Sequence, residues 1–279
     1  MSAARPPEGA QSRNPQGEVF PISDSVLLHR DGPVVRLTLN RPEVLNALDI
    51  GMAHAFLTAC RDVATAPGVR VVVLRGAGRS FMAGGDVAAM LADPRGVAGE
   101  LIATMHEALC VLAEGSATVL AALHGPVAGA GLSLALAADL SIAASNASFN
   151  LAYAKIGASC DLGASWALPR IVGLRKAMEI ALLNDNLGAQ EALTLGIVNR
   201  VVAPDELEVA TAEWAQRLAA GPAIAQSQLR SLLRGSFDRG FREQLDAEQQ
   251  AFLHCAGTED FLEGAAAFLS KRAPVFTGR

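Results

Sequence analysis

Two glycine-rich segments have the residue types to bind an oxygen atom that carries developing negative charge. They read SFMAGGD over 80–86 and HGPVAGAG over 124–131. Each follows an apolar run typical of a strand, Val69–Leu74 or Val119–Leu123, and each opens a segment with helical patterning. Glycine lets the backbone approach a ligand closely, and the first N–H groups of a helix have no partner within it. Two such ends that meet at one point would form half of an active site.

Other kinds of glycine- or serine-based site fit the sequence poorly. Gly76-x-Gly78 and Gly129-x-Gly131 follow strand patterns, but neither completes the Gly-x-Gly-x-x-Gly run that binds a dinucleotide at a helix start. The serine-centred runs at 131–135 and 163–167 lack the final glycine of a hydrolase nucleophile elbow. The chain also contains no Cys-x-x-Cys pair, so we expect no metal site.

The segments around the two loops alternate between strand and helix patterns. A β-hairpin is predicted from residues 26–28 and 34–39. Helices are predicted over 48–63, 97–112 and 132–138, and strands over 69–74, 119–123 and 140–144. These strands are almost continuously apolar, as is typical of a sheet that is covered on both faces. The pattern predicts an α/β core with parallel strand pairing.

The length and composition of the chain predict one large core with an appended helical region. Of its 279 residues, 51% are hydrophobic and 18% are charged. Residues 1–20 are rich in Pro, Gly, Gln and Ser and are expected to form a disordered tail; 21–205 are expected to form the core, and 206–279 a helical C-terminal region. The formal net charge of −5, without a cluster of Lys and Arg, does not favour nucleic acid as a partner. Since no run resembles a membrane helix, we expect a cytoplasmic protein without membrane association.

Several segments resemble the crotonase superfamily, which includes enoyl-CoA hydratases and isomerases. They read SFMAGGDV (80–87), HGPVAGAGLSLALAADLSIAA (124–144), NRPEVLNAL (40–48), LPRIVG (168–173) and ALTLGIVN (192–199). The match runs in register from about residue 25 to residue 279. The resemblance implies a spiral of strand-strand-helix repeats with a helical C-terminal region, assembled as a homotrimer or a dimer of trimers. It also implies acyl-CoA thioester substrates, with no cofactor besides the CoA that belongs to the substrate.

The resemblance assigns the oxyanion donors by position to the backbone N–H groups of Gly85 and Ala130. A thioester enolate places its negative charge on one oxygen, and loss of one donor to that oxygen typically costs about 3–4 kcal/mol of activation free energy. Ala130 contributes only its N–H, so an alanine at this position is compatible with the role if its φ is negative.

The residues expected to move protons differ from those of the family's hydratases. In these hydratases two glutamates hold the attacking water, and the corresponding positions here carry Ser133 and Tyr153. Neither side chain is a carboxylate base near neutral pH, so ordinary hydration is disfavoured.

Asp161 is the acidic residue that remains in this region, within IGASCDLG (156–163). On the residues alone it could cap a helix over 162–168. Segment 149–170, however, resembles the ring-1,2-epoxyphenylacetyl-CoA isomerases, in which an aspartate at this position moves protons. Dienoyl-CoA isomerases and 4-chlorobenzoyl-CoA dehalogenases also place a functional aspartate here. We therefore interpret Asp161 as the acid/base and expect apolar neighbours such as Ile156 and Leu162 to raise its pKa.

Further substrate contacts follow from the resemblance alone. Those near the CoA moiety and its channel are Arg41, Val44, Ala47, Met82, Ala83, Gly84 and Asp86. His106 and Tyr153 are expected near the acyl group, and Phe268 and Lys271 belong to a tail that reaches CoA, often across a subunit interface. Ordinary packing or solvated charge would also account for these residue types. A histidine satisfied on a helix face is an equally good interpretation of His106.

The sequence thus predicts an acyl-CoA isomerase of fatty acid or aromatic catabolism, with Asp161, Gly85 and Ala130 as the catalytic groups. Two alternatives stay open. One is a different reaction on the same fold, either hydration or aryl-CoA dehalogenation, and the latter needs an aromatic cradle such as Tyr153, Phe81 and Phe149. The other is a catalytically silent CoA-binding subunit, which the loss of both glutamates favours.

Overall fold

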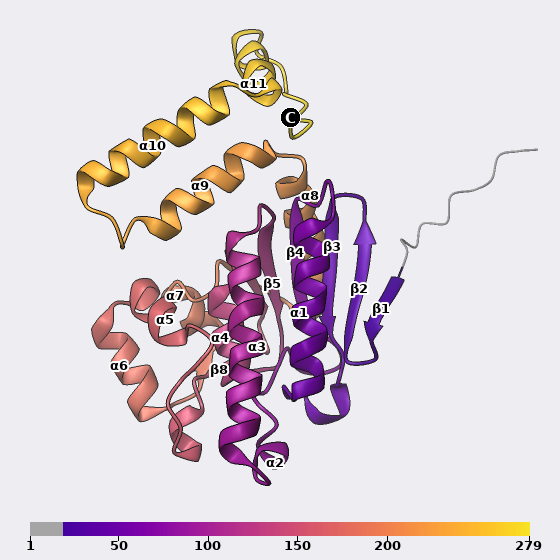
Figure 1. Ribbon diagram of the computed structural model, residues 1–279, viewed down its shortest axis with the longest axis vertical. Helices are drawn as coiled ribbons and strands as arrows, with labels where there is room; N and C mark the ends of the chain where they lie inside the picture. Colours follow the sequence, from indigo (N-terminus) through magenta and orange to yellow (C-terminus); the bar gives the residue numbers. More distant parts are fainter. Residues whose placement is uncertain (1–18) are drawn as a thin grey trace, which may run out of the picture.

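The computed structural model describes residues 19–279, whose strands form two sheets (Figure 1). The larger sheet has the order β1-β2-β3-β4-β5-β7-β10, with antiparallel pairing from β1 to β3 and parallel pairing from β3 onward. The smaller sheet has the order β6-β8-β9. The strands are β1 (Val19–Ser23), β2 (Val26–Asp31), β3 (Val34–Leu39), β4 (Val71–Gly76), β5 (Thr118–Leu123), β6 (Pro126–Ala128), β7 (Leu140–Ala144), β8 (Ser148–Asn150), β9 (Leu187–Gly188) and β10 (Arg200–Val202).

Helices cover both faces of the larger sheet. They are α1 (Ile50–Thr65), α2 (Val87–Met90), α3 (Pro94–Glu114), α4 (Ala130–Ala137), α5 (Ala164–Val172), α6 (Leu174–Leu183), α7 (Ala189–Thr194), α8 (Leu207–Ala219), α9 (Ala223–Gly235), α10 (Phe241–Ala256) and α11 (Glu259–Leu269), with short 3-10 turns η1 (Pro42–Val44), η2 (Tyr153–Ile156) and η3 (Pro204–Glu206). Helices α1 and α3 lie side by side on one face, and α8 packs on the other (Figure 1). This double cover explains why β4 and β5 are apolar along nearly their whole length.

The predicted α/β core is confirmed. The hairpin is β2 and β3, and the predicted strands and helices correspond to β4, β5, β7, α1, α3 and α4 with small shifts at their ends. Helix α1 begins where the Asp49 side chain accepts a hydrogen bond from the Met52 N–H at 2.8 Å. The smaller sheet was not predicted, because its strands are only two or three residues long. The predicted tail 1–20 lies outside the described residues except for Val19 and Phe20, which belong to β1.

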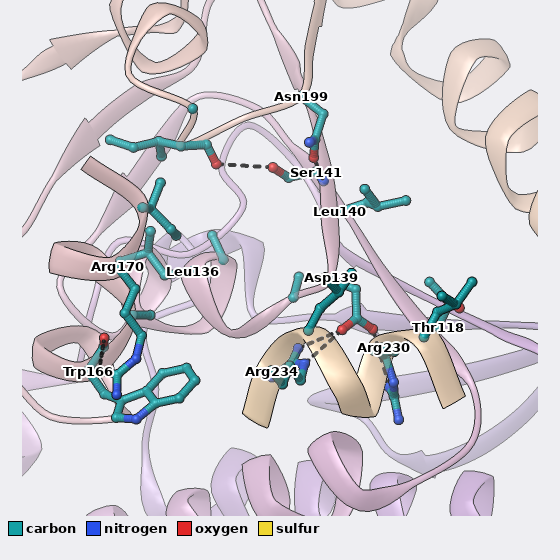
Figure 2. Close-up of a pocket in the computed structure, with 18 of the residues that line it drawn as sticks. Thr118, Leu136, Asp139, Leu140, Ser141, Trp166, Arg170, Asn199, Arg230 and Arg234 are labelled. Carbon is teal, nitrogen blue, oxygen red and sulfur yellow. Dashed lines mark hydrogen bonds and ion pairs between the residues drawn. The ribbon is translucent and has the colours of Figure 1, made fainter. Parts of the chain in front are cut away.

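The C-terminal helices divide into one that packs on the sheet and three that extend from the body. Helix α8 packs against β3, β4, β5 and β7, whereas α9, α10 and α11 form an arm above them (Figure 1). Arg230 and Arg234 of α9 attach this arm to the partly buried Asp139 at 3.2 and 2.7 Å (Figure 2). Arg230 also donates to the Ala117 carbonyl at 2.7 Å, and Arg234 to that of Ala137 at 2.8 Å, so α9 caps the C-terminal end of α4.

One helix among residues 19–279, α3, has the length and apolar composition needed to cross a bilayer. Its buried residues, among them Leu101, Met105 and Ala108, face α1 and the core. Glu100 pairs with His54 of α1 at 2.9 Å, as expected for a core helix that is exposed along one side.

Candidate active site

The two glycine-rich loops lie directly against each other. The Met82 N–H donates to the Pro126 carbonyl at 3.3 Å, and the Ala128 N–H donates to the Met82 carbonyl at 2.9 Å, which forms one rung of a parallel ladder. Beyond this rung the backbones meet glycine against glycine: a Cβ atom at Gly129 would lie 3.4 Å from the Cα of Gly84. The loops therefore touch at the residue that precedes each predicted oxyanion donor.

The N–H groups of Gly85 and Ala130 are both available for a ligand. Gly85 lies opposite Leu48 in a parallel bridge whose hydrogen bonds are made by the two neighbours of Gly85. The Leu48 N–H donates to the Gly84 carbonyl at 2.8 Å, and the Asp86 N–H donates to the Leu48 carbonyl at 2.9 Å. The N–H of Gly85 therefore points away from Leu48. Ala130 is the first residue of α4, where its φ is not positive, so the condition for an alanine at this position is met, and its N–H has no intrahelical partner. Within residues 19–279 neither group donates a hydrogen bond.

A buried asparagine that the sequence analysis missed holds the first loop in place. The Asn46 amide donates to the carbonyls of Ala77, Ser80 and Phe81 at 2.9, 2.8 and 3.1 Å, and its oxygen accepts from the Arg41 N–H at 2.8 Å. Asn46 has a φ of 58°, a left-handed conformation that asparagine tolerates better than most residues. The signal for this role in the sequence was the position of Asn46 between the apolar residues Leu45 and Ala47, since a buried amide must find hydrogen-bond partners.

Asp161, Tyr153 and Ser133 form a continuous chain of hydrogen bonds. The Tyr153 hydroxyl donates to Asp161 Oδ1 and lies 3.0 Å from Ser133 Oγ. Ser133 Oγ also lies within hydrogen-bonding distance of the Gly129 carbonyl, at 3.2 Å. Ser133 and Tyr153 thus join Asp161 to Gly129 and so to the second loop.

The environment of Asp161 favours its neutral form. Burial raises the pKa of the Asp161 carboxyl above its usual value, while the Tyr153 hydrogen bond and the positive charge that His106 carries when it is protonated act in the opposite direction. Burial, followed by the nearby Asp161 charge, raises the pKa of Tyr153, so Tyr153 keeps its proton and donates it. Leu162 is fully buried beside this carboxyl, as expected, but Ile156 is 57% exposed and does not contribute to the burial.

Asp161 does not cap a helix. Helix α5 begins at Ala164 with Gly163 as its N-cap residue, so the capping interpretation is wrong. Between them Leu162 takes a φ of 51° although it is a buried leucine, a conformation that costs of order 1–3 kcal/mol. Such strain is kept where the surrounding structure fixes a functional group, and here it fixes the residue next to Asp161.

His106 supports the strained turn after Asp161. The Leu162 N–H donates to His106 Nε2 at 3.2 Å, so this nitrogen acts as an acceptor. The structure therefore places His106 near Asp161 and gives it a backbone hydrogen-bond partner, which fits the interpretation of a satisfied histidine on a helix face. This contact positions Asp161 through the backbone of Leu162.

Arg41 and Asp86 meet each other at the mouth of the first loop. Arg41 pairs with Asp86 at 3.4 Å and with Asp49 at 3.0 Å, and it donates to the Ala47 carbonyl at 2.6 Å. Asp86 in turn accepts from the Ala89 N–H at 3.2 Å as the N-cap residue of α2. The structure shows Arg41 as an organiser of this loop, with its charge shared between two carboxylates.

The remaining predicted contacts fall into three groups. Ala83 and Gly84 belong to the first loop, and the Ala83 N–H donates at 3.0 Å to the carbonyl of Leu45, the residue that follows Val44. The Met82 side chain is fully buried in the core and contributes to the loop only through its backbone. Phe268 and Lys271 belong to the α11 end of the molecule, opposite α2, so a single chain does not bring them to the loops (Figure 1).

A cavity of about 500 Å³ lies outside this cluster, between α9 and the body (Figure 2). Asp139, Arg230 and Arg234 line it on one side, and Trp166 and Arg170 on the other, with the Arg170 guanidinium 4.1 Å from the centre of the Trp166 ring. It includes neither loop nor Asp161, so it belongs to the attachment of the arm.

Comparison with known proteins identifies the family. Residues 29–279 match the family model described as enoyl-CoA hydratase/isomerase. The chain belongs to the enoyl-CoA hydratase/isomerase family. It is 36% identical to the 1,2-epoxyphenylacetyl-CoA isomerase of Escherichia coli, over 92% of this chain and all of the relative. It is 33% identical to the carnitinyl-CoA dehydratase of Salmonella typhi, over 92% of this chain and 100% of the relative.

Solved structures of the family share the fold. An enoyl-CoA hydratase from Polaromonas superposes with a TM-score of 0.86 at 32% identity, over 90% of this chain and 99% of the other. The predicted crotonase resemblance is confirmed by these matches. The relatives carry the names of an isomerase, a dehydratase and a hydratase, so the family defines acyl-CoA chemistry and leaves the individual reaction open.

Proposed function

We propose that this protein is an acyl-CoA isomerase that moves a double bond, or a bond derived from an epoxide, through a thioester enolate. Asp161 removes a proton α or γ to the thioester and returns one elsewhere, and the N–H groups of Gly85 and Ala130 stabilise the enolate oxygen. The observation that carries the proposal is the Asp161 carboxyl, which is joined to Tyr153, caps no helix, and has a pKa that burial raises above its usual value.

The arrangement of the hydratase positions favours isomerisation over hydration. Addition of water needs a carboxylate that holds and deprotonates the water. By the resemblance, Ser133 and Tyr153 stand at the positions of the hydratase glutamates. Their hydroxyl oxygens lie 3.0 Å apart, and the Tyr153 hydroxyl donates to Asp161. The remaining carboxylate is suited to moving protons on the substrate itself, without a metal or a change of oxidation state.

Dehalogenation fits the described residues less well. Phe81 and Phe149, two of the three aromatic residues proposed for a cradle, are completely buried in the core. Moreover, the Tyr153 hydroxyl donates to Asp161 Oδ1, which lowers the nucleophilicity of that oxygen.

A largely apolar cavity of about 230 Å³ begins at Leu162 and Gly163, the two residues that follow Asp161, and is also lined by residues of α3 and α4, including Leu109 and Leu134. Its lining includes neither loop nor Asp161 itself. A dry cavity of roughly 150 Å³ is large enough to hold benzene, so this cavity has room for the apolar end of a short acyl chain or an aromatic ring.

The assembly expected from the resemblance remains a homotrimer or a dimer of trimers. The arm exposes large apolar side chains such as Phe241, Phe268 and Leu269, all three more than 80% accessible. Side chains of this kind support an interface with further copies of the chain. Phe268 and Lys271 would then contact CoA bound by a neighbouring subunit.

The test is NMR in deuterated water over a panel of 2-enoyl-, 3-enoyl- and arylacetyl-CoA thioesters. An isomerase migrates the double bond and exchanges α-protons, and it forms little 3-hydroxyacyl product. Rapid accumulation of the 3-hydroxyacyl thioester would instead show a hydratase. Binding without exchange would show a silent subunit, and a covalent adduct on Asp161 in mass spectrometry would show a dehalogenase.

A further inference from the structure

The Gly129–Ala130 peptide links the oxyanion donor to the acid/base through hydrogen bonds. The N–H of this peptide group, on Ala130, is one of the two available donors. Its carbonyl, on Gly129, accepts from Ser133, which is in turn hydrogen-bonded to Tyr153. The two sides of one peptide group are conjugated, so a hydrogen bond to the carbonyl makes the N–H a stronger donor.

The hydrogen-bonded series from Asp161 through Tyr153 and Ser133 to Gly129 has too few hydroxyl hydrogens to make all of its hydrogen bonds at once. Tyr153 and Ser133 each carry one O–H hydrogen. Three contacts compete for them: Tyr153 with Asp161, Ser133 with Tyr153, and Ser133 with Gly129 at 3.2 Å. Which contacts are made therefore depends on how strongly Asp161 holds the Tyr153 hydrogen.

The charge of Asp161 decides that competition. An ionised carboxylate is the stronger acceptor, so it takes the Tyr153 hydrogen and leaves the phenol oxygen to accept from Ser133. A neutral carboxyl is a weaker acceptor, and when its proton sits on Oδ1 it becomes a donor to Tyr153. Tyr153 can then donate to Ser133, and the Ser133 hydrogen turns to the Gly129 carbonyl.

We propose that Ser133 and Tyr153 couple the protonation of Asp161 to the strength of the Ala130 oxyanion donor. The inference rests on the proposed function in one respect, the assignment of Asp161 as the base. When Asp161 takes the substrate proton, the electron pair of the broken C–H bond passes into the enolate, and the Ser133 hydroxyl turns from Tyr153 to Gly129. The hydroxyl hydrogens reorient without leaving their oxygens. The enolate, which exists only after this step, thus meets a stronger donor than the ground-state thioester does.

The groups around the carboxyl define what else could respond to pH. His106 faces it from α3 and Tyr153 from η2, whereas α4 presents the Ser133 hydroxyl and has no charged residue. In α5 the charged residue is Arg170, which stacks on Trp166 and pairs with Asp238. His106 is therefore the one competing source of a pH-dependent signal that the experiment must separate from Asp161.

The experiment is a pH titration of the ligand-free protein by NMR, from about pH 4 to 9. Carbonyl-¹³C glycine together with ¹⁵N alanine restricts the signals to Gly–Ala peptides, and the Gly129–Ala130 signal is the one lost in Ala130→Gly. In the wild type the Gly129 carbonyl and Ala130 nitrogen should move downfield on acidification. Both Ser133→Ala and Tyr153→Phe should abolish this movement, and Asp161→Asn should hold the signal at its acidic position throughout. Ser141→Ala is the matched control, because Ser141 Oγ also donates to a backbone carbonyl, that of Ile197 at 3.2 Å.

A wild-type signal that does not move over this range would overturn the proposal. So would a movement that survives unchanged in Ser133→Ala, or one that persists in Asp161→Asn, since His106 is intact there and would be its source. The titration uses no substrate, so it is independent of whether the enzyme isomerises any thioester in the panel above. Tyr153→Phe keeps the test decisive if Ser133→Ala does not fold.

Discussion

Replacement of Gly129 by alanine should separate the two oxyanion donors from each other. Gly129 has φ 52° and ψ −121°, a conformation that an alanine reaches only at a cost of order 1–3 kcal/mol. The added Cβ would lie 3.4 Å from Gly84 Cα and 4.0 Å from Ala152 Cβ, which are ordinary contact distances, so the cost comes from the backbone conformation. The strain is relieved by rotation of the Gly129–Ala130 peptide, which turns the Ala130 N–H away from its ligand.

Loss of that one donor should lower kcat by about 10²–10³-fold, which corresponds to roughly 2.7–4 kcal/mol of activation free energy. Urea unfolding measures the free energy of unfolding, and α-proton exchange in deuterated water measures the catalytic effect. Gly173→Ala is the matched control, because Gly173 has φ 77° and its added Cβ would meet no atom within 4 Å. It should lose stability through backbone strain and keep the wild-type exchange rate. If Gly129→Ala is destabilised to the same extent as Gly173→Ala and still exchanges at the wild-type rate, the two loops do not form the oxyanion site.

Three further substitutions test the surroundings of this site. Because burial raises the pKa of Asp161 in the folded protein, wild-type stability falls as pH rises from the unfolded value near about 4 through the folded pKa. Asp161→Asn should therefore be more stable than the wild type at pH 7, and the difference in stability should disappear below about pH 4. Thermal unfolding followed by circular dichroism measures this difference, and a difference that is independent of pH would contradict the expectation. His106→Ala leaves the buried Leu162 N–H without its acceptor, so it should lower the free energy of unfolding in urea by about 1–3 kcal/mol and slow α-proton exchange. His106→Gln offers an acceptor and should recover part of both losses. Equal losses in the two variants would refute the role of that hydrogen bond. Asn46→Ala removes the donor to three carbonyls and should destabilise the protein by at least about 2 kcal/mol with raised KM, and a neutral effect would show that other contacts hold the first loop.

Local rules predicted the elements that carry the two loops. Short apolar strands and glycine-rich turns predicted β4, β5 and α4, and the helical pattern over 48–63 predicted α1 to within two residues at each end. These signals are short-range, because strand propensity, glycine geometry and capping each depend on a few neighbouring residues. The pairing of the loops needed more than this, since the contact between Gly84 and Gly129 joins residues that are far apart in the chain.

The chemistry of the site depended on contacts that the sequence does not reveal. Asp161 is a good helix-cap residue by type, and only the left-handed turn at Leu162 and Gly163 moves the start of α5 beyond it. The link from Asp161 through Tyr153 to Ser133 joins η2 to α4, and no spacing rule connects these segments. Phe268 and Lys271 were expected near CoA, but a single chain keeps them on the arm, so their role depends on how subunits assemble.

The most direct measurement of the central claim is α-proton exchange of an acyl-CoA thioester in deuterated water by the wild type and by Asp161→Asn. If Asp161 is the acid/base, the variant should bind the thioester with unchanged affinity and exchange it about 10²–10⁴-fold more slowly. Exchange at the wild-type rate by folded Asp161→Asn would contradict the account, because another group would then have to move the proton.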